Sequence, residues 1–254
     1  MSLPKKDTLY VQSVEKAFKV LSVFNAQQSA LSLMQVSKLT GHSKSSAQRF
    51  CYTLEKLGYL TRVNHNSAYE LTAKTTEIGA CFIESNSLVR RASPYLHTLS
   101  IQNEGATPLS ILDGNEIIFV SRFLGKEVLE TTVTVGSRLP IYCTASGRAA
   151  ASLLAEHELD DVLTAQSWQQ RTAKTQIDKA QVKALIMQSK DTGYALVEDQ
   201  YVLADLSLAV PIYDSASNIK GAITLALTNT KHTKEQLLAN YLGLMQSTAR
   251  MISG

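Results

Sequence analysis

The stretch "TGHSKSSAQRFCYTLEKLGYL", residues 40–60, joins a glycine and several small hydroxyl residues to a helix with one apolar face. Ser43 is suited to cap that helix, because a serine hydroxyl accepts a hydrogen bond from a backbone N–H of the first turn. Gly58 is expected to end the helix. The helical spacing predicts that the buried stripe consists of Ala47, Phe50, Leu54 and Leu57.

The flanking sequence completes a small domain around this helix. Ser32 is a plausible cap for a preceding helix, and Gly41 supplies the turn between the two helices. Downstream, "YLTRVNHNSAYELT" changes to period two and predicts two strands, 59–63 and 68–71, around the turn "NHNS". Three helices followed by such a hairpin predict a winged helix-turn-helix. The apolar positions of the first helix are Val14, Ala17, Phe18, Leu21 and Phe24.

Charge and side-chain chemistry indicate that this domain binds double-stranded operator DNA. Residues 1–91 hold 12 Lys and Arg against 6 Asp and Glu, whereas the rest holds 13 against 16. Hydroxyls beside a helix N-terminus favour phosphate, while Gln48 and Arg49 have the length and groups to reach base edges. Simple helix capping is the alternative explanation of the serines. The predicted DNA-binding residues are Ser43, Lys44, Ser45, Ser46, Gln48 and Arg49 on the helix, with Arg62 and His65 on the wing.

Several segments in order resemble the IclR-type family of bacterial transcriptional regulators. The resemblance rests on "SVEKAFKVLSVF", on residues 31–60, on "VGSRLPIYCTASGRAA" and on "TGYALVEDQYVLADLSLAVPIYD". It covers almost the whole chain. The sequence departs from the family pattern at Arg148, where Lys is usual, at Ala204, which replaces a Gly, and at Asp205 and Leu206, which replace Leu-Arg.

The fold class predicted for the whole chain is α+β. Residues 1–73 are expected to form the DNA-binding domain, 74–93 a linker helix with a bend near "ESNS", and 94–254 an effector-binding domain. In the last segment, a hairpin around "DGN", a strand "EVLETTV", a helix "SGRAAASLLAEH" and later strands predict a sheet covered by helices. The resemblance implies that this sheet domain is GAF-like.

The strand positions of three hydroxyl residues point to a small-molecule effector site. Ser110, Ser207 and Thr224 each lie between apolar neighbours, so alternation is expected to turn them toward a common concavity. A buried hydroxyl bonded to the local backbone is the alternative for each. A helix starting near Ser146 would suit a carboxylate. The resemblance implies effector contact by Val128, Thr131, Leu139, Ala145, Ser146, Ser207, Thr224 and Ala226, with Asp199 as an additional candidate.

Other classes of protein have less support. The sequence has no nucleophile elbow and no phosphate-binding glycine loop, and "SNIK" matches Ser-x-x-Lys only in a predicted turn. The sequence does not decide whether Cys143 is a reactive thiol or a small apolar side chain of the core. The three cysteines and five histidines are scattered, so neither a disulfide framework nor a metal site is expected, nor a cofactor. No apolar run is long enough for a membrane span, and the N-terminus does not look like a signal peptide, which favours a cytoplasmic protein.

We therefore expect a ligand-responsive transcriptional regulator and no catalytic residues. Its effector is expected to be a small organic or aromatic acid, and the protein a homodimer or homotetramer that reads paired half-sites. A DNA-binding protein whose C-terminal domain makes only protein contacts, and an enzyme with a DNA-binding arm, are the alternatives. The sequence leaves open the effector's identity, the operator, and whether the protein represses or activates.

Overall fold

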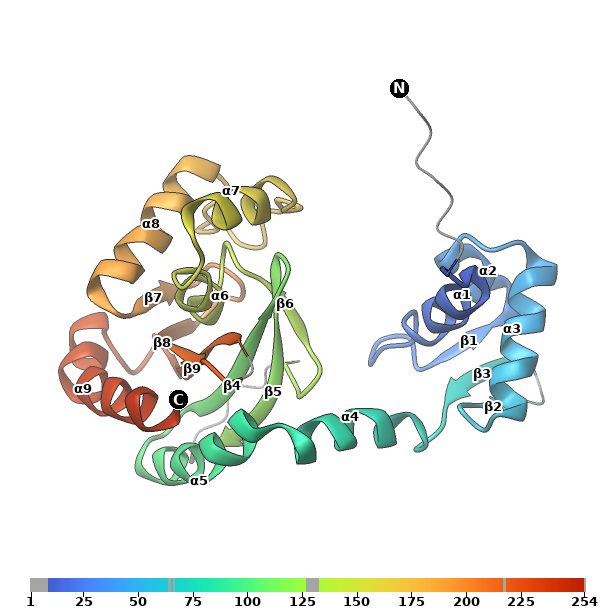
Figure 1. Cartoon of the computed structure of the whole chain (residues 1–254), viewed down its shortest axis with the longest axis horizontal. Helices are drawn as coiled ribbons and strands as arrows, with labels where there is room; N and C mark the ends of the chain where they lie inside the picture. Colours follow the sequence, from blue (N-terminus) through green and yellow to red (C-terminus); the bar gives the residue numbers. More distant parts are fainter. Residues whose placement is uncertain (1–8, 64, 66, 127–132, 217, 254) are drawn as a thin grey trace. The chain divides into compact units, whose positions relative to one another are not determined.

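The computed structural model describes residues 9–63, 65, 67–126, 133–216 and 218–253. The chain divides into two compact units, residues 1–82 and 83–254, which are described separately below (Figure 1).

The first unit is a three-helix domain with a small three-stranded sheet. Its antiparallel sheet has the order β1-β3-β2, so the predicted winged helix-turn-helix is confirmed, with β1 as an additional strand that the sequence did not predict. Helix α4, Thr75–Ser85, begins in this unit. The other elements are α1 (Gln12–Leu21), β1 (Ala30–Ser32), α2 (Leu33–Thr40), α3 (Lys44–Lys56), β2 (Leu60–Val63) and β3 (Ala68–Leu71).

Local signals fix the ends of α2 and α3 as predicted. Ser32 caps α2 in a capping box with Gln35, and the Ser43 hydroxyl accepts a hydrogen bond from the backbone N–H of Ser46 at 3.3 Å. Gly41 and Gly58 take the left-handed conformation, with φ of +71° and +81°. Residues with a Cβ rarely adopt this conformation, which explains why glycine follows each helix.

The buried faces of α1 and α3 differ from the prediction. Val14 and Phe18 are 52% and 56% exposed, and Val20 is fully buried in their place. Two residues along a helix correspond to about 200° around it, so Phe18 and Val20 lie on opposite sides of α1. On α3, Cys51 is buried with Ala47 and Leu54, whereas Leu57, just past the end of the helix, is exposed.

The second unit is built on a six-stranded antiparallel sheet with the order β6-β5-β4-β9-β8-β7. The predicted bend is found where Asn86 caps α5. The strands are β4 (Ala106–Asp113), β5 (Glu116–Leu124), β6 (Arg138–Pro140), β7 (Ala195–Glu198), β8 (Asp205–Asp214) and β9 (Ile219–Thr228). The helices are α5 (Ser87–Gln102), α6 (Ala145–Ala151), α7 (Glu156–Thr164), α8 (Lys179–Thr192) and α9 (Lys234–Ile252).

Helices cover both faces of this sheet, so the predicted α+β architecture is confirmed. Helices α5 and α9 lie on one face, while α6 lies on the other face and packs in turn against α8 (Figure 1). The predicted β4–β5 hairpin is present, with Gly114 at φ +60°. The helix predicted at 146–157 ends earlier in the structure, because α6 stops at Ala151 and a second helix, α7, begins at Glu156. The strand predicted at 127–133 falls almost entirely outside the described residues.

The two faces of the sheet carry side chains of different size. Alternate residues of a strand point to opposite faces, and β8 and β9 alternate large aliphatic residues with small ones. The face toward α5 and α9 carries Leu109, Leu206, Leu208, Val210, Ile212, Ile223, Leu225 and Leu227. The face toward α6 carries Ala106, Pro108, Ser110, Ser207, Ala209, Ala222, Thr224 and Ala226.

Candidate functional site

Helix α3 presents a polar surface to solvent in the first unit. Ser46 is half-buried, and its backbone N–H is bound to the Ser43 cap. The Ser43 and Ser45 hydroxyls lie 3.2 Å apart at the helix N-terminus, where backbone N–H groups and the helix dipole favour an anion. The remaining exposed residues predicted to bind DNA on this helix are Lys44, Ser45, Gln48 and Arg49.

Tyr52 extends the same surface by one turn, and we did not predict it as a DNA contact. It is 54% exposed, and the Lys56 ammonium lies 5.4 Å from the centre of its ring. Residues four apart on a helix share a face, so Tyr52 follows Gln48 along this surface. The alternation of buried and polar positions on α3 was the signal that would have included it.

On the wing, Arg62 contacts α3. Its Nε donates to both carboxylate oxygens of Glu55 at 3.1 Å, and its guanidinium lies 4.8 Å from the centre of the Tyr69 ring. The wing arginine is therefore held beside α3. His65, at the tip, is exposed with φ +55°.

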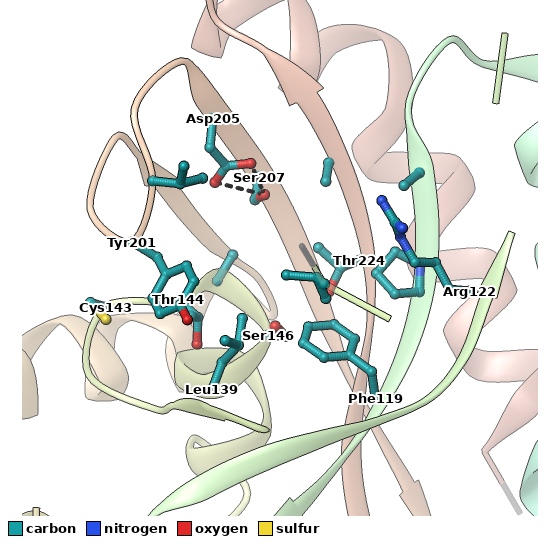
Figure 2. A pocket seen from close by; sticks show the side chains of 16 residues that line it. Phe119, Arg122, Leu139, Cys143, Thr144, Ser146, Tyr201, Asp205, Ser207 and Thr224 are labelled. Carbon is teal, nitrogen blue, oxygen red and sulfur yellow. Dashed lines mark hydrogen bonds between the residues drawn. The ribbon is translucent and has the colours of Figure 1, made fainter. Parts of the chain in front are cut away.

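The second unit contains a cavity on the small-residue face of the sheet (Figure 2). Strand pairing sets its floor. Arg122 on β5 pairs with Pro108 on β4, and in the neighbouring row Ala106 on β4 pairs with Ala226 on β9, which pairs with Ser207 on β8. Small side chains in these rows leave an open space above this face of the sheet. On the opposite face, leucine and isoleucine side chains fill the corresponding space.

Loops and α6 enclose this space. The cavity measures about 680 Å³, including its open mouth. Phe119 and Tyr201 supply aromatic walls, and the start of α6 forms another wall. Its full lining is Ala106, Pro108, Phe119, Arg122, Val133, Leu139, Cys143, Thr144, Ala145, Ser146, Tyr201, Val202, Asp205, Ser207, Thr224 and Ala226.

Three polar side chains of β8 and β9 converge on the cavity. The Thr224 hydroxyl is buried and has no hydrogen-bond partner within the part of the chain that the structure describes. The Ser207 hydroxyl donates to the Asp205 carboxylate, at 2.9 and 3.0 Å from its two oxygens (Figure 2). Burial raises the pKa of Asp205 to about 7, with a further contribution from the negative charge of Asp199.

Six of the predicted effector contacts line the cavity, but Ser110 does not. Ser110 shares its face with Thr224, yet it lies two residues beyond Pro108 on β4, fully buried beside Ala222. Its hydroxyl donates to the carbonyl oxygen of Ala222 on β9 at 3.4 Å, which is a bond to a neighbouring strand and not to the local backbone. The six that line the cavity are Leu139, Ala145, Ser146, Ser207, Thr224 and Ala226.

The other predicted contacts are not part of the described cavity. Asp199 binds the Lys174 ammonium at 2.8 Å, and this charged partner lowers the pKa of Asp199. It is absent from the described lining, so the structure does not place it against the cavity. Val128 and Thr131 lie outside the described residues.

Sequence reasoning missed the charged groups of the cavity. Arg122 and Asp205 both line it, and burial lowers the pKa of Arg122. Asp205 had a usable signal, because it departs from the family pattern two residues before Ser207 and strand alternation places both on one face. Phe119 and Arg122 lie three apart on β5, and the register shift in the β4–β5 pair brings both to the cavity face. Nothing in the local sequence marks such a shift.

The start of α6 lies one residue earlier than predicted. Thr144 caps it, accepting from the Gly147 N–H at 3.1 Å and donating to the Pro140 carbonyl at 2.8 Å. A Cβ on Gly147 would lie 2.4 Å from the Ile141 Cα, so only glycine fits without a shift of the backbone. Arg148, which could have faced solvent, is 2% exposed.

Cys143 lines the cavity as a buried thiol. Burial raises its pKa to about 11, so the thiol is protonated near neutral pH and is a weak nucleophile. Within the described ranges, no three His, Cys, Asp or Glu side chains gather as metal ligands would. In the same ranges, none of the helices has both the length and the apolar character that a membrane span requires.

A winged helix-turn-helix with an exposed recognition helix, followed by a separate domain with an internal cavity, defines a DNA-binding protein with a ligand domain. A family model described as the bacterial transcriptional regulator IclR C-terminal domain matches residues 81–254, and the IclR helix-turn-helix domain matches residues 13–64. The chain belongs to the IclR family of bacterial transcriptional regulators. It is a DNA-binding transcriptional regulator that responds to a ligand.

Individual relatives extend over almost the whole chain. HTH-type transcriptional regulator XynR of Escherichia coli (strain K12) is 30% identical over 243 residues, which cover 96% of each protein. The crystal structure of an IclR transcriptional regulator from Alicyclobacillus acidocaldarius matches with a TM-score of 0.83 at 19% identity, covering 96% of this chain and 98% of the other. An IclR homologue from Microbacterium hydrocarbonoxydans, complexed with 4-hydroxybenzoate, matches with a TM-score of 0.77 at 18% identity, covering 95% and 97%. These two structures share the fold.

Proposed function

We propose that the exposed face of α3 reads operator DNA and that a small organic or aromatic acid in the cavity controls this binding. Acting on DNA, the protein would work in the cytoplasm. The observation that carries the proposal is the cavity itself, which joins apolar and aromatic walls to a few convergent polar groups. This is the usual composition of a small-ligand site.

The DNA-binding part of the proposal rests on the chemistry of α3. Arg49 is exposed on the second turn, where its forked guanidinium can donate two hydrogen bonds to a guanine, while Gln48 suits adenine. The hydroxyls of the first turn suit the phosphate backbone. Arg62 supports the interface by holding the wing against α3 through Glu55.

Replacing Arg49 by Ala tests base reading. We expect Arg49→Ala to weaken operator binding by about 1–3 kcal/mol and to leave binding to random DNA nearly unchanged, because a base contact adds only to specific affinity. Fluorescence anisotropy with operator and scrambled duplexes measures both. Arg90→Ala, which removes an exposed arginine from α5, is the matched control. An equal loss of affinity for both duplexes would show that Arg49 contacts only phosphate.

The acid class of the effector rests on the composition of the cavity. Phe119 and Tyr201 suit a flat or apolar ligand body, and Arg122 supplies a cationic side chain for a carboxylate. Calorimetry of the full-length protein with a panel of aliphatic and aromatic acids tests the class. Heats that do not saturate for any acid would reject it.

Self-association is proposed from an apolar stripe on α1. Val11, Val14 and Phe18 follow a spacing of three and four residues and are 57%, 52% and 56% exposed. A symmetric pair of such helices would bury the stripe and would present two recognition helices to paired half-sites. Light scattering after size exclusion tests this, since a monomer at micromolar concentration would contradict it.

A further inference from the structure

We propose that Asp205 and Ser207 make the cavity selective for an acid that also carries a hydroxyl group. The carboxylate of this effector faces Arg122, and its hydroxyl donates to the Asp205–Ser207 pair. The inference rests on the proposed acid-binding function of the cavity and adds the chemistry of the ligand's second end.

The Asp205–Ser207 pair is arranged to accept a hydrogen bond. Both residues point to the cavity face of β8, and the Ser207 hydroxyl hydrogen is already donated to the carboxylate. The remaining lone pairs of the carboxylate and of the Ser207 oxygen are acceptors. A ligand hydroxyl is the complementary group, because it can donate its hydrogen to them.

The cationic group of the cavity lies at the other side. Arg122 is on β5 and Asp205 on β8, with β4 and β9 between them, so three strand spacings of about 4.8 Å separate their backbones. Figure 2 shows the two side chains on opposite sides of the cavity, with Thr224 in the region between them. A ligand that meets both ends is therefore polar at both ends.

Charge fixes the orientation of such a ligand. Above pH 7, where Asp205 is ionised, a ligand carboxylate placed against Asp205 would meet a like charge in a partly buried site. The Lys174 ammonium is not part of the cavity lining, and the cationic side chain among the described lining residues is that of Arg122. The carboxylate is therefore directed toward Arg122.

An acid that lacks the hydroxyl would bind at a cost. Its apolar end would cover the Asp205 carboxylate and replace water without offering a donor. A buried acceptor left unpaired loses its solvation free energy, and the loss is larger for a charged group. The Thr224 hydroxyl, which has no hydrogen-bond partner among the described residues, adds a second polar contact for the middle of the ligand.

The test compares matched acids with and without a hydroxyl on the full-length protein. The probes are 4-hydroxybenzoate against 4-methylbenzoate, phenyllactate against phenylpropionate, and gluconate against hexanoate. We expect at least one hydroxylated acid to bind about tenfold or more tightly than its partner, as for a hydrogen bond to a charged group. Isothermal titration calorimetry at pH 8 measures each affinity.

Two variants assign that preference to Asp205. Asp205→Leu should reduce the ratio between the two acids to within about twofold, because the acceptor is gone. Asp205→Asn keeps the shape of the side chain and should give an intermediate ratio, which provides a result if the leucine variant does not fold. Asp191→Leu, at an exposed position of α8, is the matched control and should keep the wild-type ratio.

The outcomes separate this inference from the function on which it rests. Acids that bind equally well with and without the hydroxyl would overturn the inference and leave acid binding intact. A hydroxyl preference that survives in both Asp205 variants would also overturn it. No binding by any of the six acids would reject the acid-binding function and the inference together.

Discussion

The two faces of the six-stranded sheet are built from the same strands, but one face is closely packed and the other lines a cavity. On the face toward α5 and α9, leucine, isoleucine and valine fill the space to the helices. On the face toward α6, alanine, serine, threonine and proline leave the cavity. Alternate residues of β8 and β9 thus pack in the core and line the cavity.

The largest expected effect is a packing defect on the filled face. Leu225→Ala should lower the free energy of unfolding by about 2–5 kcal/mol, because Leu225 is fully buried and its removal leaves a void. Urea unfolding followed by circular dichroism measures the change. Leu139→Ala is the matched control, since Leu139 lines an existing cavity. Equal losses for the two variants would erase the proposed difference between the faces.

An intermediate effect is expected from the pH dependence of the cavity face. The pKa of Asp205 is about 7 in the folded protein and about 3.9 in an unfolded chain, so the folded state binds more protons between these values. Stability contributed by this group is therefore present below about pH 4 and is lost as pH rises through about 7.

Asp205→Asn should remove that loss. Each pKa unit corresponds to about 1.4 kcal/mol, so unfolding of the variant at pH 5 and pH 8 should differ less than unfolding of the wild type. Urea titrations at the two pH values provide the comparison. Parallel curves for wild type and variant would show that Asp205 titrates normally in the folded protein.

The smallest change in stability is expected at Thr224, whose hydroxyl has no hydrogen-bond partner in the part of the chain that the structure describes. Thr224→Val keeps the side-chain shape and should leave stability unchanged or raise it by up to about 1 kcal/mol, while weakening effector binding. Thr107→Val on the opposite face is the control, because the Thr107 hydroxyl donates to the Leu96 carbonyl at 3.0 Å. That variant should lose about 1–3 kcal/mol. Thermal unfolding of both variants gives the contrast, and a clear loss for Thr224→Val would reveal a hidden partner.

Short-range signals predicted much of the fold. The serine caps, the two helix-ending glycines and the "DGN" turn each act within a few residues, and the structure has them where expected. Helix α1 shows where such signals fail, because it carries apolar side chains on two sides. Only the packing partners decide that Val20 is buried and Phe18 exposed.

The candidate ligand site was predictable only in part for a similar reason. Alternation correctly placed Ser207 and Thr224 on one face of the sheet, since this depends on strand geometry alone. It also placed Ser110 there, but position along the strand excludes Ser110 from the cavity. Arg122 and Tyr201 join the site through strand order and a loop, which depend on contacts distant in the sequence.

Arg148 has a consequence for the order of the cavity walls before the effector binds. Its guanidinium donates to the Tyr142 carbonyl at 2.9 and 2.7 Å and to the Gln200 side-chain oxygen at 2.6 Å, so it ties together two segments that border the cavity. Separating these segments would leave the buried Arg148 guanidinium without its hydrogen-bond acceptors. We therefore expect these two segments to be ordered before the effector binds, so that little of the binding free energy is spent on ordering them. Amide hydrogen exchange around Tyr142 and Gln200 should accordingly be equally slow with and without the effector.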